Sequence, residues 1–120
     1  MANQIVHIEI GVTNLLDGKK FYKKSFPHWN IEKQDDIPDY YSCEMDNDNL
    51  SMGIRLVDSI DGKGSILFYV NVDDINESIQ RITQVGGKVI MEKTYLGEKY
   101  GCISKLEDPF GNIIGVWSKS

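Results

Sequence analysis

The sequence is poor in cysteine, proline and basic charge, and it has no long apolar run. Two cysteines, Cys43 and Cys102, offer neither a disulfide framework nor a paired-cysteine zinc site, so we expect a cytoplasmic protein with reduced thiols. There are 13 Lys and Arg residues against 18 Asp and Glu residues, and the net charge of -5 argues against a nucleic-acid partner. No apolar stretch approaches the roughly 20 residues that span a bilayer, so we expect no membrane partner.

The 120 residues are enough for one domain with a continuous core, and their pattern predicts one succession of elements twice. The first set is a strand over 5–12, a helix over 14–26 and strands over 29–33, 40–45 and 51–57. The second set is a strand over 65–72, a helix over 74–85 and strands over 88–92, 101–106 and 112–118. Asn14 and Asp74 are suitable N-caps for the two helices. The sequence therefore predicts an α+β domain of two βαβββ modules, about 1–58 and 65–120, joined by a linker over 58–64.

Five segments carry a resemblance to a known family: Ile5-Val6-His7-Ile8-Glu9-Ile10, Phe21-Tyr22-Lys23-Lys24-Ser25-Phe26, Val70-Asn71-Val72-Asp73-Asp74-Ile75, Gly86-Gly87-Lys88-Val89 and Glu107-Asp108-Pro109-Phe110-Gly111-Asn112. In this order the chain resembles the vicinal oxygen chelate superfamily of glyoxalases, bleomycin resistance proteins and dioxygenases. Within this superfamily the chain most resembles uncharacterised proteins related to lactoylglutathione lyase. They share its His-x-Glu opening and a Gly-x-Trp ending such as Gly115-Val116-Trp117. The resemblance implies a curved mixed sheet around a cavity, with helices on the outer face, and a homodimer.

Strand alternation separates residues that face a helix from residues that face the cavity. The expected helix-facing positions of the two first strands are Val6, Ile8, Ile10, Ile66, Phe68 and Val70. The opposite parity, applied to the last strands as well, directs six polar or aromatic side chains inward: His7, Glu9, Arg55, Tyr69, Asn71 and Trp117. Such a mixture on a partly apolar wall is typical of a site for a small organic molecule.

His7 and Glu9 lie two residues apart on one face and are the candidate catalytic acid/base pair. Arg55, Tyr69, Asn71 and Trp117 are the candidate ligand-binding residues. Two alternatives remain open at this point. Arg55 could form an ion pair with Glu9 instead of holding an anionic ligand, and Tyr69 and Trp117 could serve as cavity wall.

Three functions fit this arrangement. The first is the binding of a small organic ligand, with or without conversion by a metal-independent lyase or isomerase that uses His7 and Glu9. The second is a drug-sequestering protein of the bleomycin-resistance type, and the third is a metal-dependent lyase or dioxygenase. The fold alone does not separate them, because one scaffold carries many functions.

The family resemblance also implies where a metal ion would bind. Each module of a glyoxalase-type relative offers one donor from its first strand and one carboxylate from its last. In this sequence those positions are His7, Gly53, Leu67 and Gly115, of which only His7 has a donor atom. One imidazole cannot hold a catalytic metal ion, and Arg55 would repel a cation, so we expect no metal or other cofactor.

Overall fold

The computed structural model describes residues 3–45, 49–60, 62 and 65–120, and these form two compact units. Within these ranges, residues 7–66 belong to the first unit, and residues 3–6 belong with residues 67–120 to the second. Each strand that crosses this division is assigned to the module that holds most of its residues. Positions 61, 63 and 64 of the expected linker lie outside the described residues. Within the described part of the chain, neither helix is long and apolar enough to cross a membrane.

The first module contains β1 (Ile5–Val12), α1 (Leu15–Ser25), β2 (Asn30–Lys33), β3 (Tyr40–Glu44) and β4 (Ser51–Leu56). Its strands lie in the order β2-β3-β4-β1, with β1 parallel to β4 and the other neighbours antiparallel. The helix begins after Asn14, whose side-chain oxygen accepts a hydrogen bond from the Asp17 N–H at 3.0 Å.

Helix α1 packs against β2, β3 and β4 and closes the core of this module. The buried members of that core are Ile10, Ile31, Cys43, Met52 and Ile54. Gly18 is the buried position of the helix, and an added Cβ there would press on Val12. The absence of a side chain at Gly18 therefore lets the helix lie close to the sheet.

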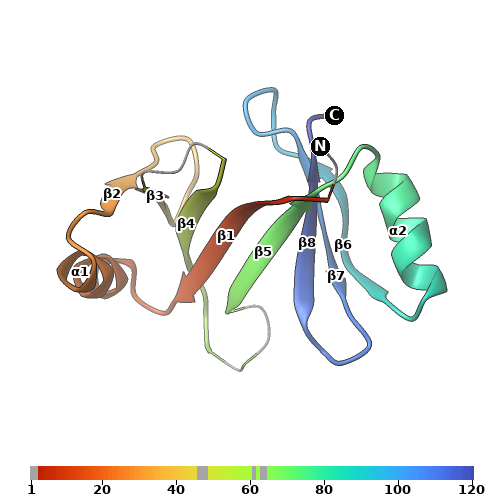
Figure 1. Ribbon diagram of the computed structural model, residues 1–120. Helices are drawn as coiled ribbons and strands as arrows, with labels where there is room; N and C mark the ends of the chain where they lie inside the picture. The colour runs from red at the N-terminus through yellow and green to blue at the C-terminus, as the bar shows by residue number, and fades with distance from the viewer. Residues whose placement is uncertain (1–2, 46–48, 61, 63–64) are drawn as a thin grey trace. The chain divides into compact units, whose positions relative to one another are not determined.

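The second module contains β5 (Ile66–Asn71), α2 (Ile75–Gln84), β6 (Lys88–Tyr95), β7 (Cys102–Glu107) and β8 (Ile113–Ser118). Its strand order is β5-β8-β7-β6, with β5 parallel to β8 and the others antiparallel. Asp74 caps α2 through the Glu77 N–H at 3.1 Å, and α2 packs against β6, β7 and β8 (Figure 1). The core residues here are Val72, Ile75, Cys102, Leu106 and Val116.

A tight turn joins β7 to β8. The Asp108 carboxylate accepts hydrogen bonds from the Asn112 side chain and from the N–H groups of Asn112 and Phe110. These hydrogen bonds hold the pKa of the Asp108 carboxyl below its usual value, and the bond from the Asn112 side chain has the largest effect. The Asp108 side chain therefore stabilises the turn that connects the two paired strands.

The predicted element order and the α+β class are confirmed, and most strand and helix bounds agree within two residues. The helix-facing assignment is right for Ile8, Ile10 and Val70, which join the two cores. It is wrong for Ile66 and Phe68, whose exposed fractions are 65% and 38%. The core that includes α2 takes in Val70, near the end of β5, whereas Ile66 and Phe68, nearer its start, stay exposed.

Candidate functional site

The imidazole of His7 is held at both ring nitrogens by side chains of its own module. Nδ1 forms a hydrogen bond of 2.5 Å with Ser51 Oγ, and Nε2 forms one of 2.8 Å with the Tyr40 hydroxyl. Ser51 is the direct neighbour of His7 in the β1–β4 register, so strand pairing brings it to the ring. The ring is thus fixed in orientation, as an acid/base residue requires.

A carboxylate and a guanidinium extend this arrangement along the same face. Glu9 Oε2 lies 3.5 Å from His7 Nε2, and the other oxygen of Glu9 accepts a hydrogen bond from Arg55 Nε at 3.2 Å. The three side chains are 23%, 13% and 27% exposed for His7, Glu9 and Arg55 respectively. The structure therefore brings together the three polar residues predicted for the first module, and it contains the Glu9–Arg55 ion pair that the sequence left as an alternative.

Sequence reasoning missed Tyr40. This residue opens β3 after a turn whose last residue, Asp39, has a left-handed φ of 56°. The Tyr40 ring lies over Gly53, so that a Cβ at position 53 would overlap the ring and the hydroxyl. The glycine was visible in the sequence, but only the register of β3 with β4 shows which side chain fills the space above it.

The other three predicted site residues lie in the second module. The Tyr69 side chain is buried and its ring lies over Gly115, its register partner on β8. The indole Nε1 of Trp117 donates a hydrogen bond of 2.6 Å to the Tyr100 carbonyl. Asn71 neighbours Trp117 in the register. Within their module Tyr69 and Trp117 are firmly held, and their contribution to ligand binding stays a prediction.

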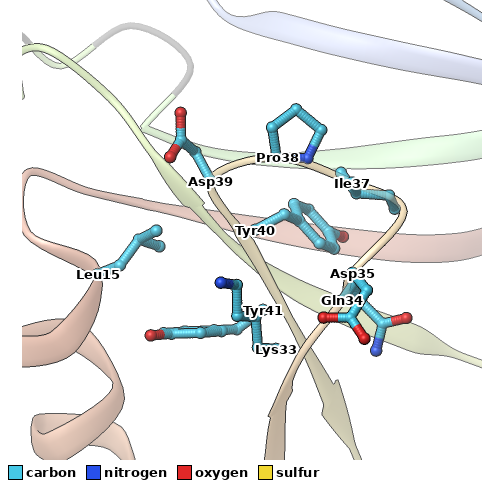
Figure 2. Close-up of a pocket in the computed structure, with 9 residues that line it drawn as sticks. All are labelled: Leu15, Lys33, Gln34, Asp35, Ile37, Pro38, Asp39, Tyr40 and Tyr41. Atoms are coloured by element: carbon cyan, nitrogen blue, oxygen red, sulfur yellow. The ribbon is translucent and has the colours of Figure 1, made fainter.

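A surface hollow of about 400 Å³ lies in the first module between the start of α1 and the β2–β3 connection (Figure 2). Its lining residues are Leu15, Lys33, Gln34, Asp35, Ile37, Pro38, Asp39, Tyr40 and Tyr41. Figure 2 shows the segment from Ile37 to Asp39 arching along one side of the hollow. His7, Glu9 and Arg55 do not line it, so the hollow is distinct from the cluster around His7 and shares only Tyr40 with it.

The residues present do not fit a metal ion of the glyoxalase type. The Tyr40 ring fills the space above Gly53, and the Tyr69 ring fills the space above Gly115, where the carboxylates of such a site would stand. Glu9 is engaged by Arg55, which would also repel a cation. Among the described residues there is no group of three or more His, Cys, Asp and Glu side chains that could hold a metal ion. We therefore derive no step through a metal.

Comparison with known proteins identifies the class to which this fold belongs. The sequence profile of the Glyoxalase/Bleomycin resistance protein/Dioxygenase superfamily matches residues 4–116, which is nearly the whole chain. The chain belongs to this superfamily, in agreement with the resemblance of its sequence motifs. A search of curated proteins gives no significant match.

Solved structures with the same fold come from proteins of different activities. A hypothetical protein from Bacillus halodurans C-125 has a TM-score of 0.70 at 18% identity, covering 100% of this chain and 96% of its own. The Mn(II)-bound glyoxalase from Novosphingobium aromaticivorans has a TM-score of 0.70 at 14% identity, with 98% and 39% covered. A methylmalonyl-CoA epimerase from Mycobacterium tuberculosis has a TM-score of 0.65 at 13% identity, with 99% and 89% covered. At these identities the likeness shows the fold alone.

Proposed function

We propose that this protein binds a small organic molecule bearing a carbonyl or carboxylate group and moves a proton on it as a metal-independent lyase or isomerase. The observation that carries the proposal is the fixed cluster of His7, Glu9 and Arg55 on one face of the first module. His7 is the proton-accepting group, and Glu9 stabilises the imidazolium that forms. No metal ion takes part in this scheme.

The geometry supports proton transfer for a specific reason. Ser51, Tyr40 and Glu9 place oxygen atoms around the two nitrogens of His7, so both N–H groups of an imidazolium have acceptors. A histidine with a purely structural role in a cavity wall does not need hydrogen-bond acceptors for both N–H groups of an imidazolium. The cluster is also largely screened from water, which strengthens the interaction between imidazolium and carboxylate.

Arg55 acts on the ligand through Glu9 in this proposal. By holding Oε1 it leaves Oε2 directed at His7. Arg55 also places a positive charge beside the ligand, where it favours a carboxylate or an enolate-like oxygen. The ion pair and the ligand contact are therefore compatible uses of one guanidinium.

Hydrogen exchange tests the proposed chemistry on several classes of carbonyl compound at once. Chelator-treated protein is mixed in D2O with a panel of small 2-oxo acids, 2-hydroxy ketones and acyl thioesters, and the C–H signals next to each carbonyl are followed by ¹H NMR. We expect the protein to replace one such hydrogen by deuterium and the variant His7→Gln to lose about a hundredfold or more of that rate. His28→Gln, which changes the chain's other histidine, is the matched control and should exchange like the parent.

Three results would contradict the proposal. Exchange that survives in His7→Gln would remove His7 from the chemistry. Exchange that needs a divalent ion for its return after chelation would establish the metal-dependent alternative. Ligand binding without exchange in the parent protein would instead support the sequestering function.

We also propose that the protein is a homodimer. Three large apolar side chains on or beside α1 are strongly exposed, with fractions of 55% for Leu16, 62% for Phe21 and 46% for Phe26. A partner chain would remove such side chains from water. Sedimentation at micromolar concentration should give twice the chain mass of 13.6 kDa, and a species of the single mass would contradict the proposal.

A further inference from the structure

We propose that Tyr40 is the group through which a ligand exchanges its proton with His7: the phenol oxygen contacts the ligand, and the phenol proton passes to His7 Nε2. This inference rests on the proposed function, because it takes His7 as the final proton acceptor. It adds a residue that neither the sequence pattern nor the family resemblance singled out. Four features of the first module carry it.

The first feature is the way in which the Tyr40 side chain is positioned. Tyr40 pairs with Arg55 across the β3–β4 register, and the Asp39 carbonyl accepts a hydrogen bond of 3.1 Å from the Leu56 N–H. The hydroxyl end of the ring lies over Gly53, where any side chain would displace it. The backbone and a glycine therefore fix the phenol oxygen 2.8 Å from His7 Nε2.

The second feature is the saturation of His7. Ser51 Oγ is the partner of Nδ1 and the Tyr40 oxygen is the partner of Nε2. Each nitrogen of an imidazole forms one hydrogen bond in the ring plane, so no position is left for a direct bond to a ligand. A ligand proton therefore reaches the imidazole through one of the two hydroxyl groups. Tyr40 is the one on the Nε2 side, where the Glu9 carboxylate lies.

The third feature is the order of the partners at Nε2. The Tyr40 oxygen is the nearer partner at 2.8 Å, and Glu9 Oε2 stands farther away at 3.5 Å. We assign to this arrangement the tautomer in which His7 donates Nδ1–H to Ser51 Oγ and accepts the Tyr40 O–H at Nε2.

The fourth feature is the balance of the step that this arrangement permits. The bond between the ligand and its acidic hydrogen breaks, and its electron pair stays on the ligand. That hydrogen forms a new O–H bond on Tyr40 while the original phenol proton leaves for His7 Nε2. The products are a ligand anion and an imidazolium, which faces Glu9 at ion-pair distance. Return of the proton by the same route restores every group.

Nitrogen NMR on the full-length protein tests the inference without any ligand. Histidine labelled with ¹⁵N reports the tautomer of His7, and His28 provides a reference signal outside the cluster. We expect His7 in the parent protein to carry its proton on Nδ1. In Tyr40→Phe, which keeps the ring over Gly53 and removes only the hydroxyl, we expect loss of that preference as Nε2 takes the proton and turns to Glu9.

A second variant guards against an indirect effect of the first. Gly53→Ala keeps the Tyr40 hydroxyl but pushes the ring away from His7, so it should change the His7 signals in the same direction. The His28 signals should stay unchanged in both variants. An unaltered His7 tautomer in both Tyr40→Phe and Gly53→Ala would overturn the inference.

The hydrogen-exchange assay separates this inference from the proposed function. With any carbonyl compound that the parent protein exchanges, Tyr40→Phe should lose most of the exchange rate, by about a hundredfold, while the concentration for half-maximal rate changes little. Exchange at the parent rate in Tyr40→Phe, together with its loss in His7→Gln, would overturn the role of Tyr40 and leave that of His7 standing. Exchange that persists in His7→Gln would remove the proposed function itself.

Discussion

The two modules share one plan and use it for different ends. In both, a strand leads into an N-capped helix, a glycine lies on the last strand, and a tyrosine ring covers that glycine. In the first module the tyrosine comes from β3 and leaves the neighbouring β1 positions to His7 and Glu9. In the second module the tyrosine is Tyr69 on β5 itself, beside a buried Leu67.

This difference shows how polar chemistry can be confined to one half of a duplicated scaffold. Leu67 and Tyr69 are 2% and 3% exposed, and the burial of their apolar surface stabilises the fold. His7 and Glu9, at the equivalent positions, have charged and polar neighbours and keep some exposure. We infer that the second module mainly stabilises the fold, whereas the first carries the candidate reaction site.

Exchanging the residues at the equivalent positions should have the largest effect. Leu67→His places an imidazole in a site built for an apolar side chain and should lower the free energy of unfolding by about 3 kcal/mol, from lost burial and an unsatisfied polar group. His7→Leu should cost about 1 kcal/mol or less, because the His7 site is partly exposed. Urea denaturation measures both. Equal costs would contradict the division of roles between the modules.

Filling the two glycine positions should distinguish the two tyrosines. A Cβ at Gly115 would overlap Cγ, Cδ1 and Cε1 of the Tyr69 ring, and that ring is buried. Gly115→Ala should therefore lower the free energy of unfolding by about 2 kcal/mol. At Gly53 the Cβ meets the far end of a half-buried Tyr40, which can swing aside at about 1 kcal/mol or less. Thermal and urea unfolding should rank the variants in this order, and the reverse order would show that Tyr40 is the more rigid ring.

Removing the guanidinium should have a smaller effect on stability. Arg55→Leu leaves the mostly buried Glu9 carboxylate without its cationic partner, at an expected cost of about 1 kcal/mol. The double variant Arg55→Leu with Glu9→Gln removes the charge that was left behind and should recover part of the loss. Additive losses in a double-mutant cycle would contradict an energetically coupled pair.

Cysteine reactivity should differ least between the modules, since Cys43 and Cys102 are both buried and neither is in a disulfide. Burial raises the pKa of the Cys43 thiol, and the charge of Lys23 opposes this only in part. A raised pKa lowers the fraction of thiolate at neutral pH, so iodoacetamide should label native Cys43 slowly and faster as the pH rises past the ordinary thiol range. Mass spectrometry of labelled peptides checks this, and rapid labelling at neutral pH would contradict it.

Much of the fold could be predicted from sequence because its signals are local. Asn14 and Asp74 mark the helix starts by their own side-chain chemistry, and alternation placed Ile8, Ile10 and Val70 correctly. Alternation failed at Ile66 and Phe68, because burial also depends on where along a strand the tertiary contacts lie. No periodicity within a strand encodes that position.

The residues of the candidate site also fall into two groups: those that strand parity predicts and one that depends on tertiary structure. Parity was sufficient to place His7, Glu9 and Arg55 on one face, where the structure shows them in contact. Tyr40 could not be predicted, since its position depends on the register between β3 and β4 after an irregular turn. The ring packs over Gly53, and a glycine in a sequence does not indicate which side chain lies above it.

The packing of Tyr40 on Gly53 also restricts how this sequence can evolve. A carboxylate side chain at position 53 would collide with the ring and displace the hydroxyl from His7. Loss of the ring by itself leaves a gap above the glycine and removes the partner of His7. The two positions are therefore coupled: the effect of a substitution at one of them depends on the residue at the other.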